Sequence, residues 1–372
     1  MLILLNPSID QNSFEFQYTL KALQKLPGIE VKINRVQGKT QSLTEIYLLG
    51  DTNDLSKENI EALPGVSKVF RISAEYKILG RNNITEKASF EYNGVTFSQD
   101  NLNVFAGLCA VDNKSNVESM MKALKEHGQT CTRMGAYKPR TSPYSFQGLG
   151  KDCLPYVFEL AGKYGIKVIA MEITHERQIE EIVTLMGVSG NATGVMLQIG
   201  TRNAQNFELL RAVGSQSTFP VLFKRGYGIT LSESLHAAEY LAQANNHNII
   251  FCLRGVKSLF GAPHRNLVDF AHVPVIHRLT RMPVGIDPSH SAGSLAECPD
   301  GMSDIFHVTA QGVVSGANLV LVDFHPDPAT AVVDSRQAIS IKDLGWFLED
   351  IAISRKAYEQ RKKLAEKQHA NV

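Results

Sequence analysis

The sequence of 372 residues is poor in cysteine and balanced in charge, and these two features exclude several classes of protein. Its five cysteines are odd in number and widely spread, and no two of them form a CxxC pair. This pattern favours free thiols in a reducing compartment over a disulfide framework. The formal net charge of +1 supplies no overall basic field, so no nucleic-acid partner is expected and any anion must be bound by local groups.

Long apolar runs are missing as well. No apolar stretch approaches the ~18–20 residues of a membrane-spanning helix, so no membrane partner is expected. The first residues, MLILLN, carry neither a cationic leader nor a small-residue cleavage site, and we interpret them as a strand rather than a signal peptide. With the free thiols, this predicts a cytoplasmic protein.

Residues 1–75 are predicted to form a small domain of their own. Strand-like and helix-like segments follow one another in the order strand–helix–strand–strand–helix–strand, from MLILLN to VSKVFRIS. This is the split βαβ order of a ferredoxin-like α+β domain. Residues 76–102 are polar and rich in turn formers, and we assign them as a linker and lead-in to the next domain.

Eight short apolar runs alternate with helical segments over residues 103–350. Several runs are continuous and apolar, as expected of strands buried on both faces. Eight such units predict an α/β protein with a (β/α)8 (TIM) barrel. The alternative is a doubly wound open sheet, which a GxGxxG motif after an early strand would favour, and the sequence has no such motif. Residues 351–372 are predicted to form a solvated C-terminal helix and tail.

In such a barrel the active site lies at the C-terminal ends of the strands, and every predicted strand is followed there by ionisable or metal-binding side chains. Arginine binds phosphate or carboxylate bidentately, and lysine acts as a compact charge. Six cations around one cleft would repel one another without an anionic ligand, although one or two of them are expected to pair with Glu172 or Asp287. The six are Arg133, Lys138, Arg140, Arg202, Lys224 and Arg254.

A second group at the strand ends combines sulfur, nitrogen and oxygen ligands. Its members are Cys109, His290, Asp323 and Asp334. Such a mixed set suits Mn²⁺, Fe²⁺, Zn²⁺ or Co²⁺ and argues against Ca²⁺ or Mg²⁺. The alternative for Cys109 is a packed small hydrophobe, because a lone cysteine after a strand often has that role.

The stretch GAYKPRTSPY (135–144) follows the second predicted barrel strand. Its proline between two cations is excluded from a helix interior and from a central strand. We therefore expect an ordered loop on the rim that presents Lys138 and Arg140, together with the hydroxyls of Thr141 and Ser142.

Seven stretches of the sequence resemble one known family. They are GAYKPRTSPYSFQGLG (135–150), LQIGTRNAQNFELL (197–210), LFKRG (222–226), CLRG (252–255), RNLVDFAHVPVI (265–276), DPSHSAG (287–293) and FHPDPATAVVDSRQ (324–337). Together they resemble the 3-deoxy-D-arabino-heptulosonate 7-phosphate (DAHP) synthases of the short type I (beta) subgroup, which is related to the 3-deoxy-octulosonate 8-phosphate synthases. The front domain is similar to the ferredoxin-like domain that some members carry.

The resemblance implies a transferase that condenses phosphoenolpyruvate with erythrose 4-phosphate in an aldol-type reaction, releases inorganic phosphate and opens the shikimate route to aromatic amino acids. It implies a divalent metal ion (Mn, Fe, Co or Zn) and a homotetramer. The implied metal ligands are Cys109, His290, Asp323 and Asp334. Phosphoenolpyruvate would meet Arg133, Lys138, Arg202, Lys224 and Arg254, with Thr201 in the same site. The phosphate of the aldehyde would meet Arg140, Thr141 and Ser142.

The catalytic residues implied by the resemblance are Lys138, Glu172 and His290. Lys138 lies between the two implied anion sites and is the candidate for proton transfer or for orienting the aldehyde oxygen. We expect crowding by other cations to lower its pKa. Glu172 is the candidate for positioning water, and His290 also belongs to the implied metal ligands.

Several positions depart from the family pattern. The first strand ends in GLCA where GPCS is usual, Leu253 stands where an acid is common, and Asp323 stands where glutamate is the usual metal ligand. Aspartate is one methylene shorter, so the ion is expected to sit differently, to bind through water or to bind more weakly. RGYGIT and ITHERQ also differ from the common turns. The KPRTS loop favours erythrose 4-phosphate, because the octulosonate enzymes carry a different loop here.

Two other functions stay open at this point. One is a related condensation of phosphoenolpyruvate with a different phosphorylated aldehyde, and the other is an inactive regulatory paralogue that keeps the barrel. For the front domain, the resemblance suggests inhibition by tyrosine or phenylalanine, and the alternative is a domain that only supports oligomerisation.

Overall fold

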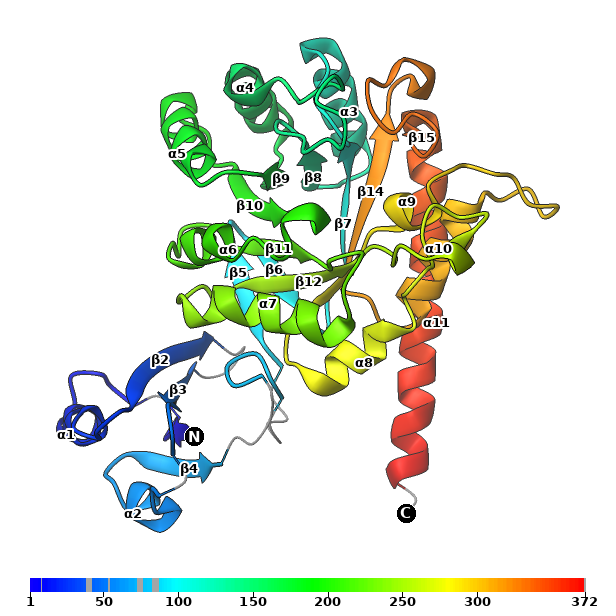
Figure 1. The fold of residues 1–372 in the computed structure, drawn as a ribbon. Helices are drawn as coiled ribbons and strands as arrows, with labels where there is room; N and C mark the ends of the chain where they lie inside the picture. The colour runs from blue at the N-terminus through cyan, green and yellow to red at the C-terminus, as the bar shows by residue number, and fades with distance from the viewer. Residues whose placement is uncertain (8, 38–41, 53, 72–75, 82–86, 371–372) are drawn as a thin grey trace.

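The computed structural model describes residues 1–7, 9–37, 42–52, 54–71, 76–81 and 87–370. The last residues of the predicted strand 66–73, part of the predicted linker and the end of the tail lie outside this description. A small antiparallel sheet with two helices adjoins a closed barrel of parallel strands (Figure 1). None of the described helices is long and apolar enough to cross a membrane.

The N-terminal unit has the predicted ferredoxin-like order of elements. They are β1 (Leu2–Leu5), α1 (Phe14–Gln24), β2 (Glu30–Gln37), β3 (Ser42–Leu49), α2 (Lys57–Glu61) and β4 (Val66–Phe70). The strands pair antiparallel in the order β2-β3-β1-β4, which confirms the split βαβ prediction. The Ser13 side chain accepts a hydrogen bond from the Phe16 amide and so caps α1, which buries Phe16 and Leu23 against the sheet.

The eight apolar runs of the sequence form the eight parallel strands of the barrel, and the predicted fold class is confirmed. Neighbouring strands pair in sequence order, and β13 pairs with β14 while β14 pairs with β7, so the ring is closed. The strands are β7 (Asn103–Leu108), β8 (Cys131–Met134), β9 (Val168–Ile173), β10 (Gly194–Ile199), β11 (Val221–Lys224), β12 (Ile249–Leu253), β13 (Val284–Ile286) and β14 (Leu319–His325).

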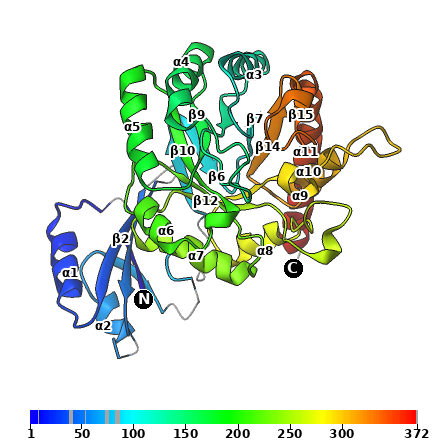
Figure 2. The ribbon, with the colours of Figure 1, turned by 45° about the horizontal axis from the view of Figure 1, so that its top comes forward.

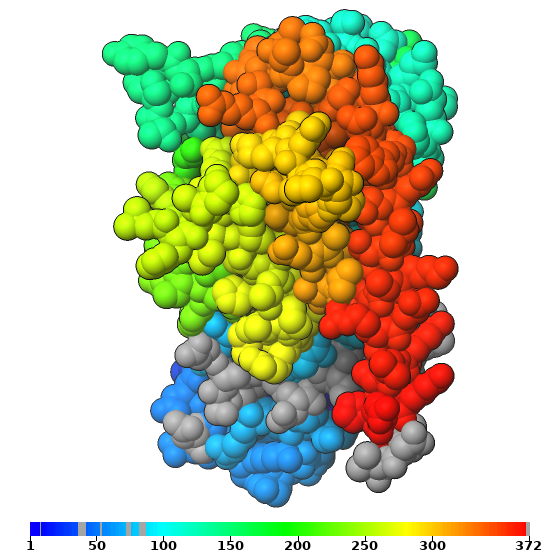
Figure 3. Space-filling view, turned by 90° about the vertical axis from the view of Figure 1, so that its right-hand side faces the viewer, coloured from blue at the N-terminus to red at the C-terminus, as the bar shows by residue number. Residues whose placement is uncertain are grey.

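Eight helices follow the strands and surround the barrel (Figures 1 and 2). They are α3 (Lys114–Glu126), α4 (Leu154–Tyr164), α5 (Arg177–Ser189), α6 (Phe207–Gly214), α7 (Leu231–Gln243), α8 (His272–Leu279), α10 (Asp304–Val314) and α11 (Leu344–Ala370), with a short α9 (Pro288–Ala292) before α10. Helix α11 continues across position 350, where the predicted barrel domain ends, and runs along the barrel to the level of the N-terminal unit (Figure 3).

A two-stranded hairpin closes the bottom of the barrel, and the sequence analysis missed it by assigning residues 76–102 as linker and lead-in. Strands β5 (Ser89–Tyr92) and β6 (Val95–Ser98) are joined by Asn93 and Gly94, both with positive φ. Asn-Gly between alternating residues is the usual signal for such a turn. The hairpin packs Phe90 and Phe97 into the same core as Phe105, beneath the barrel interior.

A buried ion pair joins the N-terminal unit to the barrel. Arg281, between α8 and β13, donates to both carboxylate oxygens of Glu45 on β3, at 2.5 and 3.1 Å, and to the Tyr47 hydroxyl at 2.7 Å. All three side chains are buried. Because Arg281 lies before the N-terminal end of a barrel strand, the small domain docks on the face away from the catalytic rim. On α7, Glu239 accepts hydrogen bonds from the backbone amides of residues 77–79, which fixes the exit from the domain.

We predict that Arg281→Met lowers the free energy of unfolding by about 3–5 kcal/mol, because it leaves the Glu45 carboxylate buried without its cation. Urea unfolding at neutral pH measures the loss. Lys122→Met, in an exposed helical ion pair, is the matched control and should change stability by less than about 0.5 kcal/mol. Equal effects of the two substitutions would contradict this account of the domain junction.

Candidate functional site

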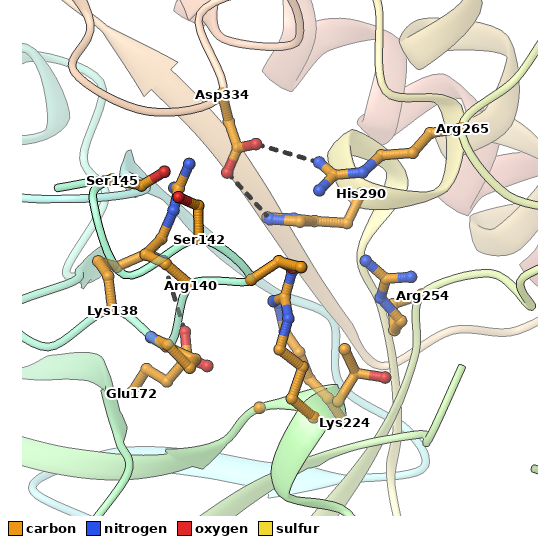
Figure 4. Close-up of a pocket in the computed structure, with 15 residues that line it drawn as sticks. Lys138, Arg140, Ser142, Ser145, Glu172, Lys224, Arg254, Arg265, His290 and Asp334 are labelled. Carbon is orange, nitrogen blue, oxygen red and sulfur yellow. Dashed lines mark hydrogen bonds and ion pairs between the residues drawn. The ribbon is translucent and has the colours of Figure 1, made fainter. Parts of the chain in front are cut away.

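The polar residues predicted at the strand ends meet in one pocket of about 250 Å³ on the C-terminal rim of the barrel. The pocket walls come from the loop after β8, from the ends of β9 to β13 and from the loops after β12 and β14. Of the nine predicted substrate-binding residues, eight line it; they are Lys138, Arg140, Thr141, Ser142, Thr201, Arg202, Lys224 and Arg254. Arg133 lies below the pocket. Figure 4 shows Arg140, Ser142 and Ser145 on one side and Lys224 and Arg254 on the other, with His290 and Asp334 near the top.

The four predicted metal ligands lie together, with one ligand atom of each within 4.8 Å of the others. Cys109 Sγ is 3.3 Å from Asp334 Oδ2 and 3.8 Å from His290 Nε2, and His290 Nε2 is 3.6 Å from Asp334 Oδ2. Bonds of about 2.0–2.3 Å to a tetrahedral ion produce ligand separations of this size. These donors therefore fit a divalent metal ion. The backbone of Asp334 has a φ of 52°, a left-handed conformation that non-glycine residues rarely adopt.

Asp323 takes part in the cluster differently from the other three ligands. One of its oxygens pairs with Arg133 and the other accepts a hydrogen bond from Gln337 Nε2 at 2.6 Å. Both Asp323 oxygens therefore have protein partners, and the expectation that an ion sits differently here stays a prediction. The negative charge of Asp323 balances Arg133, whose side chain is otherwise desolvated.

His290 is oriented by Asp287, the residue that begins α9. The Asp287 carboxylate meets His290 Nδ1 at 2.9 Å and also pairs with Lys224, which confirms one of the expected barrel ion pairs. This contact leaves Nε2 facing Cys109 and Asp334, so Nε2 is the nitrogen that an ion would meet. Burial alone would lower the pKa of His290, but the Asp287 and Asp323 carboxylates outweigh it and raise that pKa to about 10.

Lys138 is buried between the Cys109 sulfur and the Glu172 carboxylate. Its Nζ lies 3.4 Å from both Cys109 Sγ and Glu172 Oε2. Burial acts to lower the pKa of Lys138, but the negative charges of a Cys109 thiolate and of Glu172 outweigh burial and raise the pKa above its usual value. The expectation that cation crowding lowers this pKa was wrong, because these partners were not visible in the sequence. Gly200 makes room for Glu172, since a Cβ there would lie 1.9 Å from Glu172 Oε1.

Three cations of the pocket, Arg140, Arg202 and Arg254, make no ion pair with any residue that the structure describes. Arg254 is buried, and its Nε has no hydrogen-bond partner among those residues. Burial lowers the pKa of Arg254. A desolvated guanidinium without a counterion is unfavourable in free energy, so an anionic ligand at this point would stabilise the pocket.

Sequence reasoning missed Arg265 as a site residue, although the stretch that contains it was recognised. Arg265 Nη1 donates to Asp334 Oδ1 at 3.1 Å and to Gln337 Oε1 at 3.0 Å, and its side chain lines the pocket. Ser145 also lines the pocket, and Gln337 holds Asp323. These residues lie within loops rather than directly after a strand, so the strand-end rule had no signal for them.

Fold and site together define a (β/α)8 barrel whose C-terminal rim combines a cluster of side chains that fit a divalent metal ion with a cationic pocket. A family model described as the DAHP synthetase I family matches residues 82–359. The chain belongs to this family.

Two proteins of Thermotoga maritima origin are similar to most of the chain. A curated phospho-2-dehydro-3-deoxyheptonate aldolase is 34% identical over 328 residues, which cover 88% of this chain and 89% of the relative. A crystal structure of a DAHP synthase from that organism is similar with a TM-score of 0.68, at 29% identity and with 96% and 97% of the two chains covered. A 2-dehydro-3-deoxyphosphooctonate aldolase of Nitrobacter hamburgensis is more distant, at 26% identity over 67% of this chain and 86% of its own.

We predict that Asp287→Asn weakens divalent-metal binding by about 10- to 100-fold, because the amide can no longer hold His290 with a carboxylate charge. Titration of the chelator-treated protein with Mn²⁺ or Zn²⁺ measures the change. Asp269→Asn is the matched control, since this buried carboxylate pairs with Arg225 outside the cluster and should leave metal affinity unchanged. Unchanged affinity in Asp287→Asn would refute the orienting role.

Proposed function

We propose that this protein is a DAHP synthase, a transferase that condenses phosphoenolpyruvate with erythrose 4-phosphate, takes up water and releases inorganic phosphate. The observation that carries the proposal is the charge of the pocket beside the metal-binding cluster. Six lysine and arginine side chains line the pocket against two carboxylates. Two phosphorylated reactants supply the missing negative charge, and family membership agrees with this pair of reactants.

The two sides of the pocket suit different parts of the reactants. We assign phosphoenolpyruvate to Arg202, Lys224 and Arg254, with Arg133 and Lys138 at the inner end and Thr201 beside them. The phosphate of the aldehyde is assigned to Arg140, Thr141 and Ser142 in the loop after β8. When both reactants are bound with C3 of the enol near the aldehyde carbon, a reaction between two molecules becomes effectively unimolecular. Such positioning lowers the activation free energy by up to about 7–11 kcal/mol.

Lys138 is the proposed proton donor. Its raised pKa keeps the ammonium charged at neutral pH, so it can protonate the aldehyde oxygen as C3 forms the new bond. The positive centre left at C2 then takes a water molecule before phosphate leaves. Glu172, 3.4 Å from Lys138, is the proposed group that positions this water and accepts its proton.

Cys109, His290 and Asp334 are the proposed ligands of a divalent ion. Asp323 is either a fourth ligand or a carboxylate that lies beside the other three. Mn²⁺, Fe²⁺, Co²⁺ and Zn²⁺ suit this donor set. When bound, the ion supplies Lewis-acid polarisation of the aldehyde carbonyl.

The remaining parts of the proposal rest on the resemblance of the sequence to the family. They are a domain boundary near residue 75, a barrel from 103 to about 350, assembly as a homotetramer, and inhibition by tyrosine or phenylalanine through the N-terminal unit. The ferredoxin-like strand order of that unit supports the last of these.

We predict that purified protein with a divalent metal releases phosphate from phosphoenolpyruvate when erythrose 4-phosphate is present, and that a chelator stops the release. A coupled phosphate assay with a panel of aldehydes measures this. A five-carbon sugar phosphate is the most informative alternative aldehyde in the panel. Its five carbons and the three carbons of phosphoenolpyruvate would give an eight-carbon product, an octonate. Turnover with that aldehyde and none with erythrose 4-phosphate would overturn the substrate assignment, and no turnover despite phosphoenolpyruvate binding would indicate an inactive protein.

We predict that Lys138 and Arg140, both in the loop after β8, have different roles in the reaction. Lys138→Met should lower kcat by at least about 100-fold through loss of the proton donor. Arg140→Ala should instead raise KM for erythrose 4-phosphate by about 10- to 100-fold, because one charged contact to its phosphate is lost. Steady-state kinetics with each substrate varied separates the two effects.

The control for both is Lys151→Ala, an exposed cation beyond the same loop that does not line the pocket. It should leave both constants unchanged. If Lys138→Met and Arg140→Ala lowered stability alike and spared the kinetics, the loop would have a structural role only.

A further inference from the structure

A second group of metal-binding side chains lies outside the pocket, on the connection between α9 and α10. Figures 1 and 2 show this connection, after residue 293, as a long loop that extends away from the barrel. It carries Cys298 and Asp300, and the first turn of α10 adds His307. One ligand atom of each of the three lies within 4.8 Å of the other two.

The three side chains are held by a hydrogen-bonded turn. The Gly301 amide donates to the Cys298 carbonyl at 3.0 Å, and the Cys298 amide donates to the Met302 carbonyl at 2.8 Å. The Met302 amide donates to Asp300 Oδ1 at 3.0 Å, which directs the other carboxylate oxygen toward the helix. There His307 Nε2 meets Asp300 Oδ2 at 3.0 Å. The turn therefore sets the thiol, the carboxylate and the imidazole on the same side.

A further carboxylate adjoins the sulfur, and a further imidazole adjoins that carboxylate. Cys298 Sγ donates to Asp304 Oδ1 at 3.6 Å, and the other oxygen of Asp304 lies 3.3 Å from His264 Nε2. The positive end of the α10 dipole disfavours a cation at this place, and the two aspartates offset that effect. An outer partner such as His264, which holds Asp304, is what orients a ligand in known metal sites.

We propose that Cys298, Asp300 and His307 bind a second divalent cation, of the borderline class represented by Zn²⁺ and Co²⁺, with Asp304 as the fourth ligand. A thiolate, an imidazole and carboxylates are the donors that this class prefers, and four protein ligands complete a tetrahedral shell. The separations of 3.0 Å between His307 and Asp300 and of 3.6 Å between Cys298 and Asp304 already suit the ligands of one ion. The two pairs must move closer to each other for all four to bind the same ion. These side chains are partly exposed. The exposed ion pair between Asp300 and His307, which metal binding would replace, contributes little to stability.

The position of this second cluster gives it a structural consequence. His264 precedes Arg265, which contacts Asp334 in the pocket, and the Leu295 amide donates to the Arg336 carbonyl at 3.0 Å next to the same region. A bound cation would fasten the loop and α10 to the segment that carries Arg265. The second cation would thus have a structural role, distinct from the metal in the pocket.

Metal stoichiometry of the full-length protein tests the proposal. The protein is freed of metal with a chelator and titrated with Co²⁺ in equilibrium dialysis, and the thiolate-to-cobalt absorption is recorded. We expect two equivalents for the natural sequence, one for Cys298→Ser and one for His307→Asn. Cys109→Ser should also retain one equivalent, with a thiolate absorption that comes from Cys298. His175→Asn, an exposed histidine outside both clusters, should still bind two.

The proposal is overturned if the natural sequence binds a single equivalent that Cys298→Ser and His307→Asn retain, or if those two variants still bind two equivalents. Circular dichroism checks the fold of each variant. If Cys109→Ser fails to fold, the difference between Cys298→Ser and the natural sequence decides the question, because that substitution lies in a surface loop. None of these measurements depends on turnover. They therefore test the second cation site whether or not the proposed synthase activity is found.

Discussion

Desolvated charge at the C-terminal rim of the barrel is the constraint on which the rest of the site depends. A charge inside a protein is costly unless it is paired and hydrogen-bonded. Arg133 is therefore matched by Asp323, Lys224 by Asp287, and Lys138 by Glu172 and Cys109. Three cations of the pocket, Arg140, Arg202 and Arg254, are left without an ion-pair partner among the described residues, and these are the groups that the proposed anionic reactants would meet.

The same pairs also set the chemistry of the site. Asp287 turns His290 so that Nε2 faces Cys109 and Asp334, and Gln337 and Arg133 hold the Asp323 carboxylate beside these proposed ligands. Glu172 reaches Lys138 because Gly200 leaves space for it. The barrel strands fix Arg133, Glu172 and Asp323, because each of these residues lies in a strand whose register is set by its two neighbours. The loop after β8 then adds Arg140 as a further cation of the pocket.

Much of this arrangement could be predicted from the sequence because parallel strands buried on both faces appear as near-continuous apolar runs. Once eight such runs were found, the strand-end rule placed Cys109, Glu172 and Lys224 on one rim. The rule failed for Arg265 and Gln337, which reach the site from the middle of loops. It also gave the wrong direction for the pKa of Lys138, because the pairing of charges depends on side-chain placement. The β5–β6 hairpin carried its own signal in Asn93-Gly94, and only the surrounding polar residues concealed it.

The central claim is that this pocket joins two phosphorylated molecules through a new carbon–carbon bond. The most direct measurement is carbon NMR of the product formed from phosphoenolpyruvate labelled with ¹³C at C3 and erythrose 4-phosphate labelled with ¹³C at the aldehyde carbon. The account predicts a one-bond coupling between the two labelled carbons, absent when the metal is removed. Release of phosphate without that coupling would show simple hydrolysis and would contradict the account.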